Sequence, residues 1–141
     1  MDGISDEEFE SAVRWLDSAR INYAHGNVDI AVYSLEMSFE IGIKSLLHKF
    51  KRDVPKTHSV EDFFVVSLEK SPGIKPETKS GLLSYMEDFR RLLRLRNVAG
   101  YVFENKRKRE SLKEVYEATI ESVESFLGYV ENAIKEIDHT P

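Results

Sequence analysis

Largely apolar residues recur at spacings of three and four through the last third of the chain. They are Leu112, Val115, Tyr116, Thr119, Ile120, Val123, Phe126, Leu127, Val130, Ile134 and Ile137. Because an α-helix repeats every 3.6 residues, this spacing places all of them on one helical face. The pattern predicts a long C-terminal helix that buries one side against the rest of the protein.

The N-terminal part of the chain carries two more helical patterns. Ser5 and Glu8 have the spacing of a capping box, and a helix is predicted from about residue 6 to 25. Gly26 ends that helix, and a second apolar stripe continues to about residue 52, ahead of Val54-Pro55. With almost no loop between them, the two helices are expected to form an antiparallel hairpin.

The middle of the chain is predicted to be helical as well. Ser59 precedes a short helix that contains the run FFVV at 63–66, which reads equally well as a strand by itself. Helix is favoured because no second strand-like run is present to pair with it. Pro76 opens a fourth helix, whose stripe runs through Leu82, Tyr85, Met86, Phe89, Leu92 and Leu93. We therefore expect an all-α, up-and-down bundle of about five helices, with residues 1–141 as a single domain.

Composition excludes several classes of function. The 141 residues include no cysteine, so disulfide scaffolds, thiolate metal sites and cysteine nucleophiles are excluded. No two of the four histidines have the spacing of metal ligands, and we expect neither a metal nor a cofactor. The acidic N-terminus does not resemble a secretory signal, and no apolar run approaches the roughly 18 residues of a membrane span. The expected location is cytoplasmic, without membrane association.

Basic residues are concentrated in one window of an acidic chain. The net charge is −5, yet residues 90–109 hold eight basic residues and one acid, Glu104. The net charge argues against a general nucleic-acid coating protein, whereas the window is suited to binding anions. A solvated charge run, or a surface that pairs with acidic helices of the same chain, explains the window equally well.

Arg96 falls where the stripe of the fourth helix predicts its next buried residue. Burying an unpaired guanidinium is costly, so Arg96 requires a carboxylate, a water-filled cleft or a phosphate-bearing ligand. Glu40 lies in an otherwise apolar stretch of the second helix, with Lys44 four residues later on the same face. Glu40 and Arg96 are predicted to pair, either as a structural ion pair or as part of a binding site.

The residues after Arg96 add further polar groups. Asn97 and Tyr101 share a helical face if the helix continues. An arginine, an amide and a phenol close together are suited to a phosphate or a nucleobase. The candidates for binding nucleotide or RNA are Glu40, Lys44, Arg90, Arg94, Arg96, Asn97, Tyr101 and Arg107.

Two stretches resemble the HEPN domain family. The segment LEMSFEIGIKSLLHKF (35–50) is similar to the second helix of these small all-α domains, where a Glu and a Lys lie four residues apart. The segment RRLLRLRNVAGYVFE (90–104) is similar to their signature, in which an Arg, often followed by Asn, precedes a His by four to six residues and then a Tyr. The resemblance spans nearly the whole chain, and KTHSVEDFF (56–64) resembles the start of the family's third helix.

The resemblance implies a homodimer that is the partner of a minimal nucleotidyltransferase in a toxin–antitoxin pair. It also implies a metal-independent ribonuclease in which the Arg stabilises phosphate charge and the His activates the ribose hydroxyl. Arg96 and Asn97 match this motif, but Tyr101 stands where the His is expected, and no histidine lies between residues 59 and 138. A phenol has an ordinary pKa near 10 and is a poor base at neutral pH.

Three functions follow in order of preference. The first is a HEPN-like homodimer that binds nucleotide or RNA phosphates at a basic site centred on Arg96 and associates with a nucleotidyltransferase. The second is a metal-independent ribonuclease with an atypical Arg…Tyr motif, in which Arg96, Asn97 and Tyr101 are catalytic. The third is a helical adaptor with no role in nucleic-acid binding. A further hypothesis is that the partner enzyme modifies Tyr101.

Overall fold

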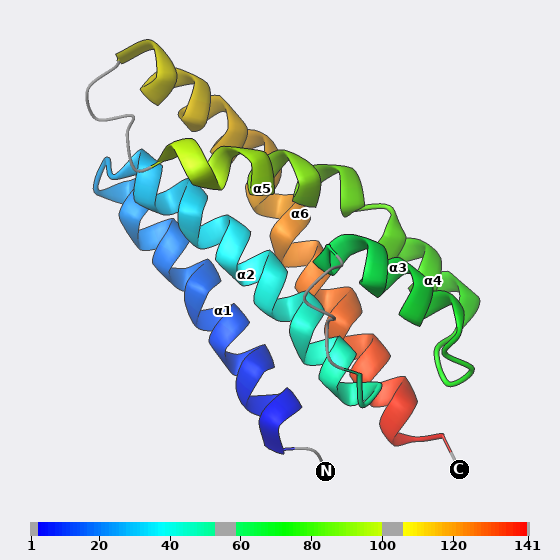
Figure 1. Ribbon diagram of the computed structural model, residues 1–141. Coiled ribbons are helices and arrows are strands. Elements are labelled where there is room, and N and C mark those ends of the chain that lie inside the picture. The colour runs from blue at the N-terminus through cyan, green and yellow to red at the C-terminus, as the bar shows by residue number, and fades with distance from the viewer. Residues whose placement is uncertain (1–2, 53–58, 100–105, 141) are drawn as a thin grey trace.

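A computed structural model describes the backbone of residues 3–52, 59–99 and 106–140, and side chains except those of 97–99 and 106–108. Every regular element within these ranges is an α-helix (Figure 1). The helices are α1 (Gly3–Ala24), α2 (Val28–Lys49), α3 (Val60–Glu69), α4 (Pro76–Leu83), α5 (Met86–Ala99) and α6 (Lys106–Asp138). The predicted all-α bundle, with its N-terminal hairpin and long last helix, is confirmed.

α1 and α2 form the predicted antiparallel hairpin (Figure 1). Gly26 makes the turn between them with φ +81°, a backbone conformation that residues with a side chain rarely adopt. Small residues on the facing sides, including Ala12, Ala19 and Ala31, are fully buried and allow the helices to approach closely. The Ser38 hydroxyl adds a bond across the interface by donating to the Ala12 carbonyl at 2.7 Å.

The capping box predicted at Ser5 is wrong. α1 already begins at Gly3, and Ser5 lies inside the helix with no exposed surface. Its hydroxyl donates to the carbonyl of Ser45 on α2 at 2.7 Å. A tertiary hydrogen bond has therefore taken the place of the local cap that the sequence spacing indicated.

α3 is a helix, as preferred over the strand alternative. Ser59 is its N-cap, and the Ser59 hydroxyl accepts a hydrogen bond from the Asp62 backbone N–H at 3.1 Å. The run FFVV lies within this helix, and its Phe64 is fully buried in the core.

The predicted fourth helix is divided into α4 and α5. Ser84 and Tyr85 form a turn between them, in which the Ser84 hydroxyl donates to the Gly81 carbonyl at 2.6 Å. The Tyr85 ring packs edge-on against Phe126 of α6, with ring centroids 6.2 Å apart. The apolar stripe continues through this turn, which is why the spacing alone indicated one helix.

α2 lies at the centre of the bundle, packed against α1, α5 and α6 (Figure 1). Phe39 of α2 stacks on Phe126 of α6 at a centroid distance of 4.1 Å and also contacts Phe89 of α5. Gly42 allows α2 and α6 to approach closely, because a Cβ there would lie 2.8 Å from the end of the Leu127 side chain. This central position brings the polar residues of α2 against α5.

None of the helices in the described ranges is long and apolar enough to cross a membrane.

Candidate functional site: an arginine and two glutamates

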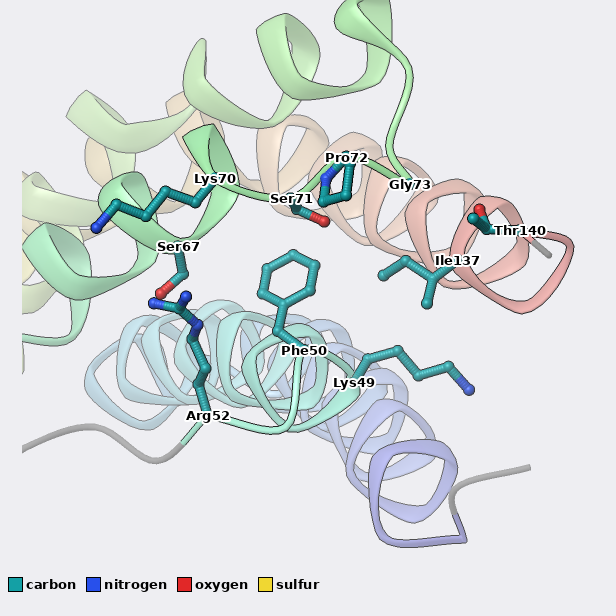
Figure 2. Close-up of a pocket in the computed structure, with 10 residues that line it drawn as sticks. All are labelled: Lys49, Phe50, Arg52, Ser67, Lys70, Ser71, Pro72, Gly73, Ile137 and Thr140. Atoms are coloured by element: carbon teal, nitrogen blue, oxygen red, sulfur yellow. The ribbon is translucent and has the colours of Figure 1, made fainter.

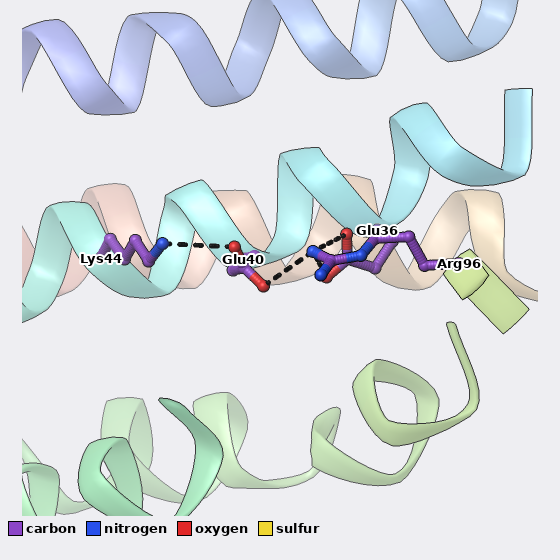
Figure 3. A network of polar contacts seen from close by, with 4 residues as sticks. All are labelled: Glu36, Glu40, Lys44 and Arg96. Carbon is purple, nitrogen blue, oxygen red and sulfur yellow. Dashed lines mark hydrogen bonds and ion pairs between the residues drawn. The ribbon is translucent and has the colours of Figure 1, made fainter. Parts of the chain in front are cut away.

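Arg96 and Glu40 lie together, as predicted. Arg96 is in the last turn of α5, and its Nη1 donates to Oε1 of Glu40 at 3.3 Å (Figure 3). The same Nη1 lies 3.3 Å from Oε2 of Glu36, one helical turn before Glu40 on α2. One guanidinium thus bridges two carboxylates on the central helix.

Glu36 was missed in the sequence. Its side chain has no exposed surface, and it lies on the same face as Val32 and Ile43, both also fully buried. The spacing of four from Val32 and seven from Ile43 is the signal that could have located it. The acid next to the core is therefore Glu36, with Glu40 at its edge, where 13% of the Glu40 side chain is exposed.

Burial, together with the nearby Glu40 carboxylate, raises the pKa of the Glu36 carboxyl to about 7, while Arg96 acts in the opposite direction. The Arg96 pKa is raised above its ordinary value, first by the charge on Glu36 and then by Glu40, against the effect of burial. The guanidinium remains charged in either case. The net charge of this cluster therefore depends on whether Glu36 holds a proton.

Lys44 completes the group on α2. Its Nζ lies 3.2 Å from Oε2 of Glu40, the i,i+4 pairing that the sequence predicted (Figure 3). The Arg96 cluster, as we call Glu36, Glu40, Lys44 and Arg96, holds two cations and two carboxyl groups. A third of the Arg96 side chain and 40% of the Lys44 side chain are exposed. Both cations therefore have one side available to solvent or to an anion.

The remaining predicted residues separate into three groups. Arg90 is exposed but paired with Glu61 of α3, so part of its charge is already neutralised. Arg94 is exposed and makes no ion pair within the part of the chain that the structure describes. Asn97 is in α5 and Arg107 in α6, but their side chains lie outside the described residues, and so does Tyr101 altogether.

Two of the three histidines for which the structure gives a position have partners outside the Arg96 cluster. His48 pairs with Glu8 across the hairpin, and the His25 ring nitrogen lies 2.8 Å from the Ile21 carbonyl. His139 is exposed near the end of the chain, after α6. Over the described residues, no group of three or more His, Asp or Glu side chains is arranged to hold a metal ion.

The chemistry available at the Arg96 cluster is that of a positioned cation. Two carboxylates fix the guanidinium, and its exposed side can donate to an oxyanion such as a phosphate. Glu36 is enclosed and acts on a ligand only through Arg96. The cluster therefore suits binding and orientation of an anion better than transfer of a proton.

Comparison with known proteins places the chain in a family. No curated protein and no solved structure matched it. Residues 6–133 match the HEPN domain, which spans the chain from α1 to the last turns of α6 and includes both halves of the Arg96 cluster. The all-helical architecture and the extent of that match agree with the resemblance of the α2 and α5 segments, and the chain belongs to the HEPN domain family.

Proposed function

We propose that this HEPN protein binds the phosphate groups of a nucleotide or RNA at the Arg96 cluster. The observation that carries the proposal is the Arg96 guanidinium, held at 3.3 Å by both Glu36 and Glu40 with one third of its side chain exposed. A guanidinium with fixed orientation loses little conformational freedom when it donates hydrogen bonds to an oxyanion.

Exposed cations on α5 support the proposal. Arg91 and Arg94 are exposed within two turns of Arg96 and have no ion-pair partner among the described residues. They provide positive charge next to the fixed guanidinium, in a chain whose net charge is −5. Arg90 contributes less because Glu61 is paired with it.

The proposal includes a homodimer and a minimal nucleotidyltransferase as the partner protein, both of which rest on family membership. The face of α2 beside Arg96 carries Tyr33, which is 38% exposed and in edge contact with Trp15 of α1. A partly exposed aromatic pair is typical of an interface, and a twofold axis there would place two Arg96 clusters near each other. The proposal takes the whole chain as one HEPN unit.

The test is binding of fluorescent single-stranded RNA in the presence of a chelator, measured by anisotropy over a range of salt concentrations. We expect Arg96→Gln to weaken binding and to lower the salt dependence by about one phosphate contact. Arg20→Gln is the matched control, because Arg20 is paired with Glu124 on the α1–α6 side. Because Arg96→Gln leaves Glu36 without its cation, the double variant Glu36→Gln/Arg96→Gln is measured beside it.

The outcomes separate the three functions. Salt-sensitive binding that Arg96→Gln weakens, without cleavage, supports the binding protein. Cleavage in chelator that disappears in Arg96→Gln supports the ribonuclease and overturns a purely binding role. Absence of binding at low salt supports the adaptor and contradicts the proposal. Equal binding by Arg96→Gln and the wild type also contradicts the proposal, because RNA would then bind elsewhere on the protein.

A further inference from the structure

A second candidate site lies at the other end of α2. A hollow of about 390 Å³ is formed by the end of α2, the turn between α3 and α4, and the end of α6 (Figure 2). Its lining comprises Lys49, Phe50, Arg52, Ser67, Lys70, Ser71, Pro72, Gly73, Ile137 and Thr140. Arg52 is 16 residues beyond Glu36, so roughly 20 Å of helix and turn separate the two sites.

Ser67 is the first observation that indicates a ligand. It is 2% exposed, and its hydroxyl has no hydrogen-bond partner among the residues that the structure describes. An unpaired buried hydroxyl is unfavourable, so such groups are normally satisfied by water or a ligand. In Figure 2 the Arg52 guanidinium extends toward this hydroxyl, which places two donors on the same side of the hollow.

The charge of the lining is the second observation. Three of the ten lining residues are cations and none is an acid. Lys49 is 6% exposed and fixed by Asp138, with Nζ 2.5 Å from Oδ1. Arg52 and Lys70 make no ion pair within the described residues, so their charge is available to an anion.

The apolar part of the lining limits the shape of the ligand. The Phe50 ring points from the end of α2 toward Ser71 and Pro72, with Ile137 to one side (Figure 2). A flat ring can pack against this surface while an oxyanion attached to it reaches Arg52 and Ser67. The volume of the hollow is that of a site for a small molecule.

We propose that this hollow binds a small aromatic molecule that carries a phosphate group. Arg52 donates two hydrogen bonds to the phosphate, the Ser67 hydroxyl donates a third, and Lys70 adds its charge at the rim. Phosphate is preferred over carboxylate because its tetrahedral oxygens accept donors from several directions. The site is separate from the Arg96 cluster and does not require RNA binding there.

The experiment is an NMR titration of the ¹⁵N-labelled full chain with phenyl phosphate, benzoate and inorganic phosphate. We expect phenyl phosphate to give saturable shift changes that are concentrated at the amides of Ser67, Lys70, Gly73 and Ile137. Arg52→Gln should weaken its binding by about tenfold or more, since it removes a charge-assisted contact. Ser67→Ala should weaken it less, with folding stability unchanged or increased. Arg14→Gln, which changes an exposed arginine on α1, is the matched control and should bind like the wild type.

Each other outcome overturns a part of the proposal. Equal binding by Arg52→Gln, equal weakening by Arg14→Gln, or the absence of saturable shift changes around Ser67 would show that the site does not exist. Binding of benzoate as tight as phenyl phosphate would refute the preference for phosphate. Binding of inorganic phosphate as tight as that of phenyl phosphate would refute the role of the aromatic ring.

Discussion

The Glu36 carboxyl is enclosed at the centre of α2 and held by a single guanidinium. Its ionised form loses water on folding, and Arg96 replaces only part of that solvation because the same Nη1 also serves Glu40. This explains why the pKa of Glu36 rises despite a cation at 3.3 Å. Its protonation state links the stability of the fold to the charge offered to an anion.

Glu36 makes folding stability depend on pH. Between its ordinary pKa of 4.5 and about 7, the unfolded chain has released the proton while the folded chain retains it. The unfolded state then binds fewer protons, so the contribution of Glu36 is fully present below 4.5 and is lost as pH rises through 7. The loss amounts to roughly 3 kcal/mol at most. We expect Glu36→Gln to remove this decrease.

The measurement is urea unfolding of both proteins at pH 5 and pH 8. Glu131→Gln is the control, because Glu131 is exposed and paired only with Lys135 one turn away. Between pH 5 and pH 8 the free energy of unfolding should fall in the wild type but not in Glu36→Gln. The variant should therefore be more stable, relative to the wild type, at pH 8 than at pH 5. A difference that is the same at both pH values would show that Glu36 is ionised throughout.

At the scale of single helices, α3 depends on one cap. The Ser59 hydroxyl accepts the Asp62 N–H at 3.1 Å, and Glu61 and Asp62 favour the same helix end electrostatically. Ser59→Ala should lower the free energy of unfolding by about 1 kcal/mol. Ser59→Asp should leave the free energy of unfolding unchanged, because Asp is also a good N-cap. Ser80→Ala, at an exposed serine within α4, serves as the comparison in thermal and urea unfolding. Equal losses in both alanine variants would contradict the capping role.

Helix positions could be predicted wherever buried spacing and local chemistry agreed. Ser59 and Pro76 marked helix starts because their effect is confined to one turn. Ser5 misled because its hydroxyl bonds to Ser45, forty residues away, and no local pattern reveals such a partner. The break at Ser84 was missed because Tyr85 keeps the apolar spacing through the turn while packing on α6.

Only part of the candidate site could be predicted from the sequence. A charge in an apolar stripe indicated Arg96, and an acid in an apolar helix indicated Glu40. The role of Glu36 depends on how α5 crosses α2, which is a tertiary arrangement. The hollow at Ser67 joins three helices distant in sequence, so its residues share no motif.

At the scale of the whole molecule, most of the aromatic side chains lie in the core or pack against it. Phe39, Phe64, Phe89 and Phe126 are fully buried, so these rings are not available for contact with a partner. Of the described residues, the large apolar side chains that stay exposed are Ile4, Val13, Ile21, Ile30, Tyr33 and Val66. All but Val66 lie on the α1–α2 hairpin. The α1–α2 hairpin is therefore the surface that the proposed homodimer would use.

A negative charge at Tyr33 should dissociate the proposed dimer. Tyr33→Asp places two like charges near a twofold axis, whereas Tyr33→Phe retains the ring and its edge contact with Trp15. We expect the wild type and Tyr33→Phe to sediment as dimers over a dilution series, and Tyr33→Asp as a monomer with an unchanged helical spectrum. Val66→Asp, on α3 and 43% exposed, is the control and should remain dimeric. A monomeric wild type, or a dimer that survives Tyr33→Asp, would remove the α2 face from the assembly and leave each Arg96 cluster to act alone.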